Sequence, residues 1–104
     1  MQHGIVDSAD TFIMNDEERS PAFMLVNQGY DVWLGNTRGN KYSRDHQWLD
    51  PNDSEDKYLF FDFSFEEMGI YDTPAVIQYI LSLTNKDKLA VLAHSQGATQ
   101  VLAC

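Results

Sequence analysis

The order of apolar and polar positions along the first half of the chain predicts one helix, one strand and one long loop. Residues 21–28 start with a proline behind Ser20, carry apolar side chains and stop before Gly29, and these are the start and stop signals of a helix. The run YDVWLG at 30–35 is short, β-branched and aromatic, so we expect a strand there. Residues 36–58 are dense in Asn, Gly, Asp and Ser, which predicts a long surface loop.

A short helix is expected to begin after Ser64. Ser64 and Glu67 have the spacing of a capping box, in which two otherwise unpaired backbone N–H groups are satisfied by side chains. Phe63 and Met68 have the spacing of a hydrophobic staple, which sets how the chain enters the helix.

A longer helix and a second strand follow. Either Asp72 or Thr73 is placed to cap this helix, because Pro74 then lies at or near its first position, and the helix should end near Asn85. Its apolar positions recur every 3.6 residues and should face the core: Val76, Ile77, Ile80 and Leu81. The run KLAVLAH at 88–94 predicts a strand buried on both faces, with a further helix behind it. This alternation predicts an α/β fold with parallel strands.

Composition narrows the function classes. The chain has 104 residues, so it holds one domain at most, and 43% of them are apolar, which is a globular composition. Its formal net charge of −9 repels phosphate backbones and anionic headgroups, so no nucleic-acid partner is expected. No apolar run is long enough for a transmembrane segment, and the polar opening MQHG is not a signal peptide. The lone Cys104 fits no metal-ligand spacing, and we expect neither metal nor cofactor.

Ser95, in the pentapeptide Ala93–His94–Ser95–Gln96–Gly97, has the strongest catalytic pattern. It lies between an apolar strand and a helix, which is where a nucleophile elbow places its serine. The elbow turns sharply, so the residues two before and two after the serine must be small. Gly97 meets this demand, whereas Ala93 adds a methyl group to the usual glycine. The alternative is a serine that only caps the next helix, and the pentapeptide alone does not decide between the two.

A second pattern supports acyl-transfer chemistry. This chemistry needs two backbone N–H groups aimed at the developing oxyanion, one from the residue after the nucleophile and one from a loop after an earlier strand. Gln96 is placed to supply the first. Ile5 is placed to supply the second, because His3–Gly4 precedes it and the glycine lets this loop come close.

These segments together resemble the acid lipase family of α/β-hydrolases, which includes gastric lipase and lysosomal acid lipase. The resemblance is carried, in order, by HGIVDSADTFIMN, GYDVWLGNTRGNKYS, FDFSFEEMGIYDTPAVIQYI and AHSQGAT. The family has His-Gly-Leu-Leu where this chain has residues 3–6, and Gly-His-Ser-Gln-Gly where it has residues 93–97. The resemblance implies that Ser95 is the nucleophile and that the N–H groups of Ile5 and Gln96 bind the oxyanion.

The resemblance also implies a function, and it indicates which parts of the family's catalytic domain this chain lacks. Members hydrolyse neutral lipid esters such as triacylglycerols and cholesteryl esters, which implies lipid degradation in the lysosome or in a secretion. In α/β-hydrolases the catalytic Asp or Glu and the His follow the serine, and neither type follows Ser95, so both would lie beyond Cys104. The family's apolar strand before His-Gly is absent too. We therefore expect residues 1–104 to be a partial α/β-hydrolase domain, truncated at both ends, with open strand edges and no efficient activity alone.

The remaining polar residues have plainer interpretations. His3 and His94 do not fit the order of the triad and are expected to be structural, and His46 is expected to be solvated in its loop. The triplet at 52–54, which begins with Asn52, matches a glycosylation acceptor, a pattern that also arises by chance.

Two function classes stay open for this chain. One is an ester hydrolase of the acid lipase type, and the other is a non-catalytic remnant or interaction piece.

Overall fold

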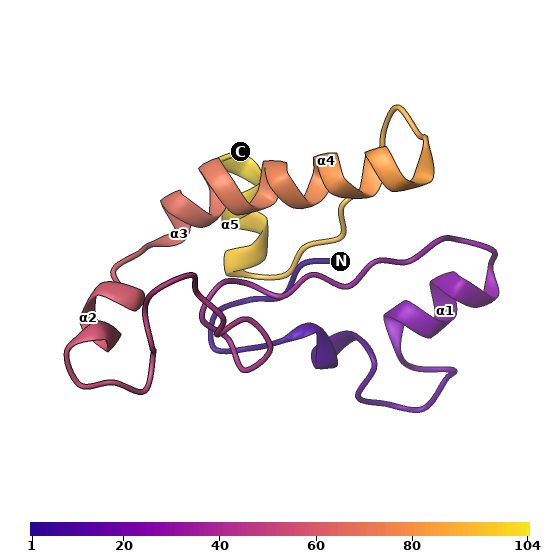
Figure 1. Cartoon of the computed structure of the whole chain (residues 1–104). Helices are drawn as coiled ribbons and strands as arrows, with labels where there is room; N and C mark the ends of the chain where they lie inside the picture. Colours follow the sequence, from indigo (N-terminus) through magenta and orange to yellow (C-terminus); the bar gives the residue numbers. More distant parts are fainter.

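The computed structural model describes residues 1–104 and shows helices placed around three extended segments (Figure 1). In chain order the helical elements are η1 (Ala9–Phe12), α1 (Pro21–Asn27), α2 (Asp56–Phe60), α3 (Phe65–Glu67), η2 (Met68–Asp72), α4 (Thr73–Thr84) and α5 (Gln96–Leu102). The longest, α4, has 12 residues, and no helix is both long and apolar enough to cross a bilayer.

The first two residues lie between the two segments that the sequence predicts as strands. On one side, the N–H of Gly35 donates to the Met1 carbonyl oxygen at 2.9 Å. On the other side, the N–H of Gln2 donates to the Leu92 carbonyl oxygen, also at 2.9 Å. Gln2 pairs with both segments in parallel orientation. The expectation that the strand before His-Gly is absent is therefore wrong for its last residues, because Met1 and Gln2 occupy that place.

Neither predicted strand forms a regular ladder. The pairing consists of isolated bridges, from Gln2 to Gly35 and from Gln2 to Ala93. Val91 is 39% exposed and Leu92 is 46% exposed, so the prediction of a strand buried on both faces is wrong. The physical reason is that the two residues between the segments offer too few partners for a continuous ladder, and neither face is covered by a complete layer.

Helix α1 confirms the predicted helix but not its cap. It covers Pro21–Asn27 and is followed by Gly29 with φ 89°, a value that glycine adopts at low cost. The hydroxyl of Ser20 makes no capping bond, because it donates to the carbonyl oxygen of Asn15 at 2.8 Å instead.

Helix α2 corrects the prediction of an uninterrupted loop over residues 36–58. The side chain of Asp53 accepts hydrogen bonds from the N–H groups of Glu55 at 2.8 Å and Asp56 at 3.1 Å, and it thereby starts this short helix. The N–H groups of Asp56 and Glu55 hold the pKa of Asp53 below its ordinary value. The sequence did not predict this helix, because an Asp-rich stretch is typical of both loops and helix starts.

The capping box before α3 is confirmed. The N–H of Ser64 donates to Glu67 at 2.7 Å, and the N–H of Glu66 donates to the Ser64 hydroxyl oxygen at 3.1 Å. Hydrogen bonds from the Ser64 hydroxyl and from the Ser64 N–H lower the pKa of the half-buried Glu67 carboxyl. The staple between Phe63 and Met68 stays a prediction.

The predicted caps at the start of α4 are wrong. The chain runs from α3 through η2 into α4 without leaving helical geometry, and Asp72 has φ −75° and ψ −47° and makes no capping bond. Thr73 also has helical dihedrals, and its hydroxyl donates to the Met68 carbonyl oxygen at 3.0 Å. Continuous helical turns already supply partners for these N–H groups, so no cap is needed. The predicted end of α4 near Asn85 is confirmed, because Asn85 follows the last helical residue and has the left-handed φ of 53°.

The apolar face of α4 is only partly covered. No residue of α4 is buried, and Val76 is 44% exposed, so the prediction that this face forms the core is wrong for Val76. The other three apolar positions, Ile77, Ile80 and Leu81, are half-buried. The buried apolar side chains come from other elements: Ala9, Phe12, Ala22, Phe60 and Met68.

Candidate active site

Ser95 lies in a strained turn between an extended segment and a helix. It has φ 53° and ψ −125°, a combination that residues other than glycine rarely adopt and that costs about 1–3 kcal/mol. Helix α5 begins at the next residue, Gln96, and the Ser95 side chain makes no capping bond to it. Ser95 is exposed. The Ser95 side chain therefore does not cap α5, although Ser95 occupies the N-cap position.

Two glycines let the start of the chain lie against this turn. A methyl group on Gly4 would lie 2.9 Å from the Cβ atom of Ser95. A methyl group on Gly97 would lie 2.5 Å from the carbonyl oxygen of His3 and 2.7 Å from that of Gln2. Side-chain carbons do not approach other atoms this closely, so both positions require glycine.

Two backbone N–H groups near this turn have no acceptor within the chain. One belongs to Gln96, the first residue of α5, where helical N–H groups have no partner in their own helix. The other belongs to Ile5, whose side chain is 67% exposed. The chain reverses sharply behind Ile5, because Val6 has φ 49°, a value that a β-branched residue rarely adopts. Both N–H groups that the sequence analysis singled out are thus free donors near Ser95.

His3 is buried and both of its ring nitrogens are engaged. Nε2 accepts a hydrogen bond from the backbone N–H of Thr37 at 3.1 Å, and Nδ1 lies 2.7 Å from the Gly4 carbonyl oxygen. A backbone N–H can only donate, so in this arrangement Nε2 is unprotonated and Nδ1 carries the proton. His3 therefore has no free nitrogen for proton transfer with Ser95, in agreement with a structural role.

The other two histidines are exposed. Nδ1 of His46 accepts N–H groups of Trp48 at 3.3 Å and of Leu49 at 3.1 Å, and the His46 ring packs edge-on against the Trp48 ring. The prediction that His46 is solvated is confirmed, and these contacts also hold His46 in its own loop. The side chain of His94 makes no hydrogen bond within the chain, although it precedes Ser95 directly.

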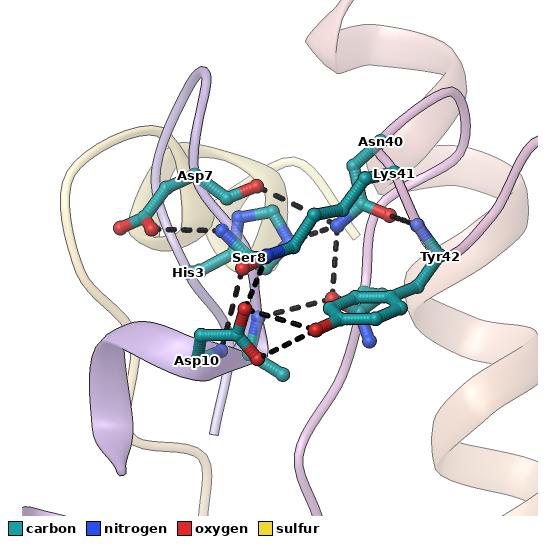
Figure 2. A network of polar contacts seen from close by, with 9 residues as sticks. His3, Asp7, Ser8, Asp10, Asn40, Lys41 and Tyr42 are labelled. Atoms are coloured by element: carbon teal, nitrogen blue, oxygen red, sulfur yellow. Dashed lines mark hydrogen bonds and ion pairs between the residues drawn. The ribbon is translucent and has the colours of Figure 1, made fainter. Parts of the chain in front are cut away.

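A polar network that the sequence did not predict connects the residues after His3 to the loop that follows Gly35. Figure 2 shows the Asn40 side chain among His3, Asp7 and Tyr42. At its edge, Lys41 and the Tyr42 hydroxyl contact the Asp10 carboxylate and lower its pKa. The only signal in the sequence was the clustering of Asn and Gly in NTRGN, which is also typical of an ordinary loop.

An ion pair anchors the same loop to the start of α4. The guanidinium of Arg38 donates two hydrogen bonds to the Asp72 carboxylate, and it also lies over the Phe63 ring, with 5.5 Å from the guanidinium carbon to the ring centroid. The carboxylate of Asp72 raises the pKa of Arg38 above its ordinary value, so the pair stays charged. This pairing explains why Asp72 does not cap α4.

The alpha/beta hydrolase fold family matches the chain over residues 1–104. The chain belongs to this family. Its relatives include Lipase 1 of Drosophila melanogaster, with 48% identity over 95% of this chain and 22% of that protein. Gastric triacylglycerol lipase of Rattus norvegicus and Lipase member K of Homo sapiens are each 46% identical over 95% of this chain and 24% of their own length.

The resemblance to acid lipases is thus confirmed, and the chain spans about a quarter of the length of the curated lipases that it matches.

This α/β-hydrolase chain has no group of three or more His, Cys, Asp or Glu side chains that could hold a metal ion. Cys104 is exposed, and so is Asn52, whose side-chain oxygen accepts a hydrogen bond from Arg44 at 3.2 Å.

Replacing Ala93 by glycine in the full-length α/β-hydrolase is expected to leave esterase activity similar or modestly higher. Ala93 pairs with Gln2 in the extended segment. We expect that removing its methyl group leaves more room at the turn. Glycine also loosens the segment, at a cost of about 0.5–1 kcal/mol. Initial rates on a short-chain ester and the thermal midpoint measure the two effects. A loss of activity of about a hundredfold would contradict this account of the turn.

Proposed function

We propose that the full-length protein containing this chain is a serine ester hydrolase that cleaves neutral lipid esters such as triacylglycerols or cholesteryl esters. The observation that carries the proposal is the strained, exposed Ser95 with two free backbone N–H groups close by. A serine in this geometry with two such donors fits acyl transfer better than a binding or structural role. Relatives named as lipases support the same class.

In the proposed reaction the Ser95 hydroxyl oxygen attacks the ester carbonyl carbon. Its proton passes to a histidine base, and the carbonyl oxygen becomes an oxyanion that the N–H groups of Ile5 and Gln96 stabilise. The alcohol leaves with the proton from that base, and water then hydrolyses the acyl-serine. His3 cannot be the base because both of its nitrogens are engaged. The base and its carboxylate partner are therefore proposed to come from the rest of the full-length protein.

The location of the protein is part of the proposal. Relatives carry names such as gastric triacylglycerol lipase and tear acid lipase-like protein. We infer a secreted or lysosomal protein that degrades neutral lipids.

A p-nitrophenyl alkylphosphonate tests the assignment of Ser95. The Ser95 oxygen should displace p-nitrophenolate from phosphorus and form a stable phosphonate ester, because the tetrahedral product resembles the transition state of acyl transfer. Mass spectrometry of the labelled full-length protein should place the added mass on the peptide that contains Ser95. Heat-unfolded protein, which lacks the strained turn, serves as the control and should stay unlabelled. Labelling of another serine with Ser95 unmodified would refute the assignment.

The 104-residue polypeptide expressed alone is expected to turn over p-nitrophenyl butyrate about 10⁴-fold or more slowly than the full-length protein. Loss of the triad elsewhere costs about 10⁶ in kcat, and binding with the oxyanion hole retains about 10³–10⁴ over water. None of the three histidines is hydrogen-bonded to Ser95. Comparable turnover that disappears in Ser95→Ala would show that a histidine of this chain reaches the serine.

A further inference from the structure

The orientation of the Ile5 N–H is set by the carbonyl group of Gly4. The two groups belong to one planar trans peptide unit, so they point in opposite directions and turn together. The Gly4 carbonyl oxygen accepts the Nδ1 proton of His3 at 2.7 Å. A side chain that holds this oxygen therefore also aims the neighbouring N–H, which is the group that the proposed function assigns to the oxyanion.

His3 can hold the Gly4 oxygen only in one tautomer. Its Nδ1 must carry the proton, so Nε2 must be an acceptor. Three groups meet Nε2: the N–H of Thr37 at 3.1 Å, the side-chain nitrogen of Asn40 at 3.2 Å and the Thr37 hydroxyl at 3.5 Å. All three come from the loop after Gly35, far from His3 in sequence but in contact with it in the fold. His3 is buried, so water does not replace these donors readily.

Asn40 is held so that its NH₂ group faces His3. Its side-chain oxygen accepts a hydrogen bond from the N–H of Tyr42 at 3.0 Å, so its side-chain nitrogen is the atom that faces His3. That nitrogen also donates to the side-chain oxygen of Asn36 at 2.8 Å, and Asn36 in turn accepts the N–H of Ala9 at 3.0 Å. The Asn40 amide is thus fixed at both ends.

We propose that Asn40 is a positioning residue for the oxyanion site: with the Thr37 N–H it keeps His3 in its Nδ1–H tautomer, and His3 through the Gly4 carbonyl aims the Ile5 N–H. This proposal rests on the proposed function of Ser95 and Ile5. Asn40 itself touches neither substrate nor serine. Its contribution is the direction of a donor that is used in the transition state, so it should change kcat and leave KM nearly unchanged.

Asn40→Asp in the full-length protein tests this role. The carboxylate keeps the acceptor for the Tyr42 N–H but places an acceptor against Nε2, so the ring must shift or change its protonation. We expect kcat on p-nitrophenyl butyrate to fall at least about tenfold with KM within about twofold, since loss of one oxyanion donor costs about 10²–10³. Asn27→Asp is the matched control, because the exposed Asn27 side chain contacts only the Glu17 carboxylate, and it should keep the wild-type kcat. A folded Asn40→Asp protein with wild-type kcat would overturn the proposal.

The tautomer of His3 gives a second readout that needs no folded variant at Asn40. Full-length protein labelled with ¹⁵N at its histidines should show His3 with Nδ1 protonated and Nε2 unprotonated, the signal being assigned by its absence in His3→Asn. An Nε2–H tautomer would overturn the proposal even if the enzyme is active. A different result would contradict the proposed function itself. That result is esterase activity that survives in Ser95→Ala.

Discussion

Ser95→Ala in the full-length protein is expected to lower kcat on a neutral lipid ester by about 10⁴–10⁶-fold, with the fold unchanged. Alanine removes the oxygen that would form the acyl-serine, and within residues 1–104 Ser95 is the only serine with positive φ. The side chain makes no hydrogen bond within the chain, so its loss leaves no buried partner unsatisfied. Stability should stay the same or rise slightly.

Initial rates on a triacylglycerol emulsion, on a cholesteryl ester and on p-nitrophenyl butyrate would measure this loss, with the thermal midpoint as the test of folding. Ser82→Ala is a suitable control, because Ser82 is exposed on α4 and its hydroxyl only donates to the Tyr79 carbonyl oxygen. It should retain wild-type rates. If Ser95→Ala kept more than about a tenth of the activity, Ser95 could not be the nucleophile.

Gly97→Ala is expected to destabilise the full-length protein by about 2 kcal/mol or more and to lower kcat at least about a hundredfold. The added methyl group would lie 2.5 Å from the His3 carbonyl oxygen and 2.7 Å from that of Gln2. Both contacts are with backbone, so either the start of the chain or α5 must move. Either movement separates the Ile5 N–H from Ser95, which is why activity should fall together with stability.

Gly29→Ala separates this steric effect from the ordinary cost of losing a glycine. Gly29 has φ 89°, and a methyl group there would meet no atom within 4 Å. The substitution should cost about 1–2 kcal/mol through backbone strain alone and leave kcat unchanged. Urea unfolding and ester hydrolysis measured on both variants give the comparison. Equal kcat values in Gly97→Ala and Gly29→Ala would show that the close approach at Gly97 is not needed for catalysis.

The structure also shows where local patterns mislead. Asp72 has the position and type of a helix cap, yet its carboxylate pairs with Arg38, a residue 34 positions away. Val91 and Leu92 are as apolar as residues of a buried strand, yet both remain partly exposed, because only Gln2 pairs with their segment. In the first case a partner from a distant part of the chain decides what the side chain binds. In the second case the lack of such partners leaves apolar side chains exposed.

The sequence alone determined the features that depend on neighbouring residues. The capping box at Ser64, the left-handed stop at Asn85 and the turn at Ser95 all follow from the residue types within a few positions. The need for a small residue at Gly97 was also readable, because an elbow leaves no room there. These signals are local because they arise from the sterics and hydrogen bonds of one or two turns of chain.

Only the tertiary structure decided how these pieces meet. The pairing of Gln2 with both Gly35 and Ala93 places Gly4 against Ser95, and no pattern within either segment encodes that pairing. The bonds of His3 to Thr37 and Asn40 join residues 34 and 37 positions apart. Polar side chains such as these are compatible with many partners, and it is the packing of distant segments that selects one of them.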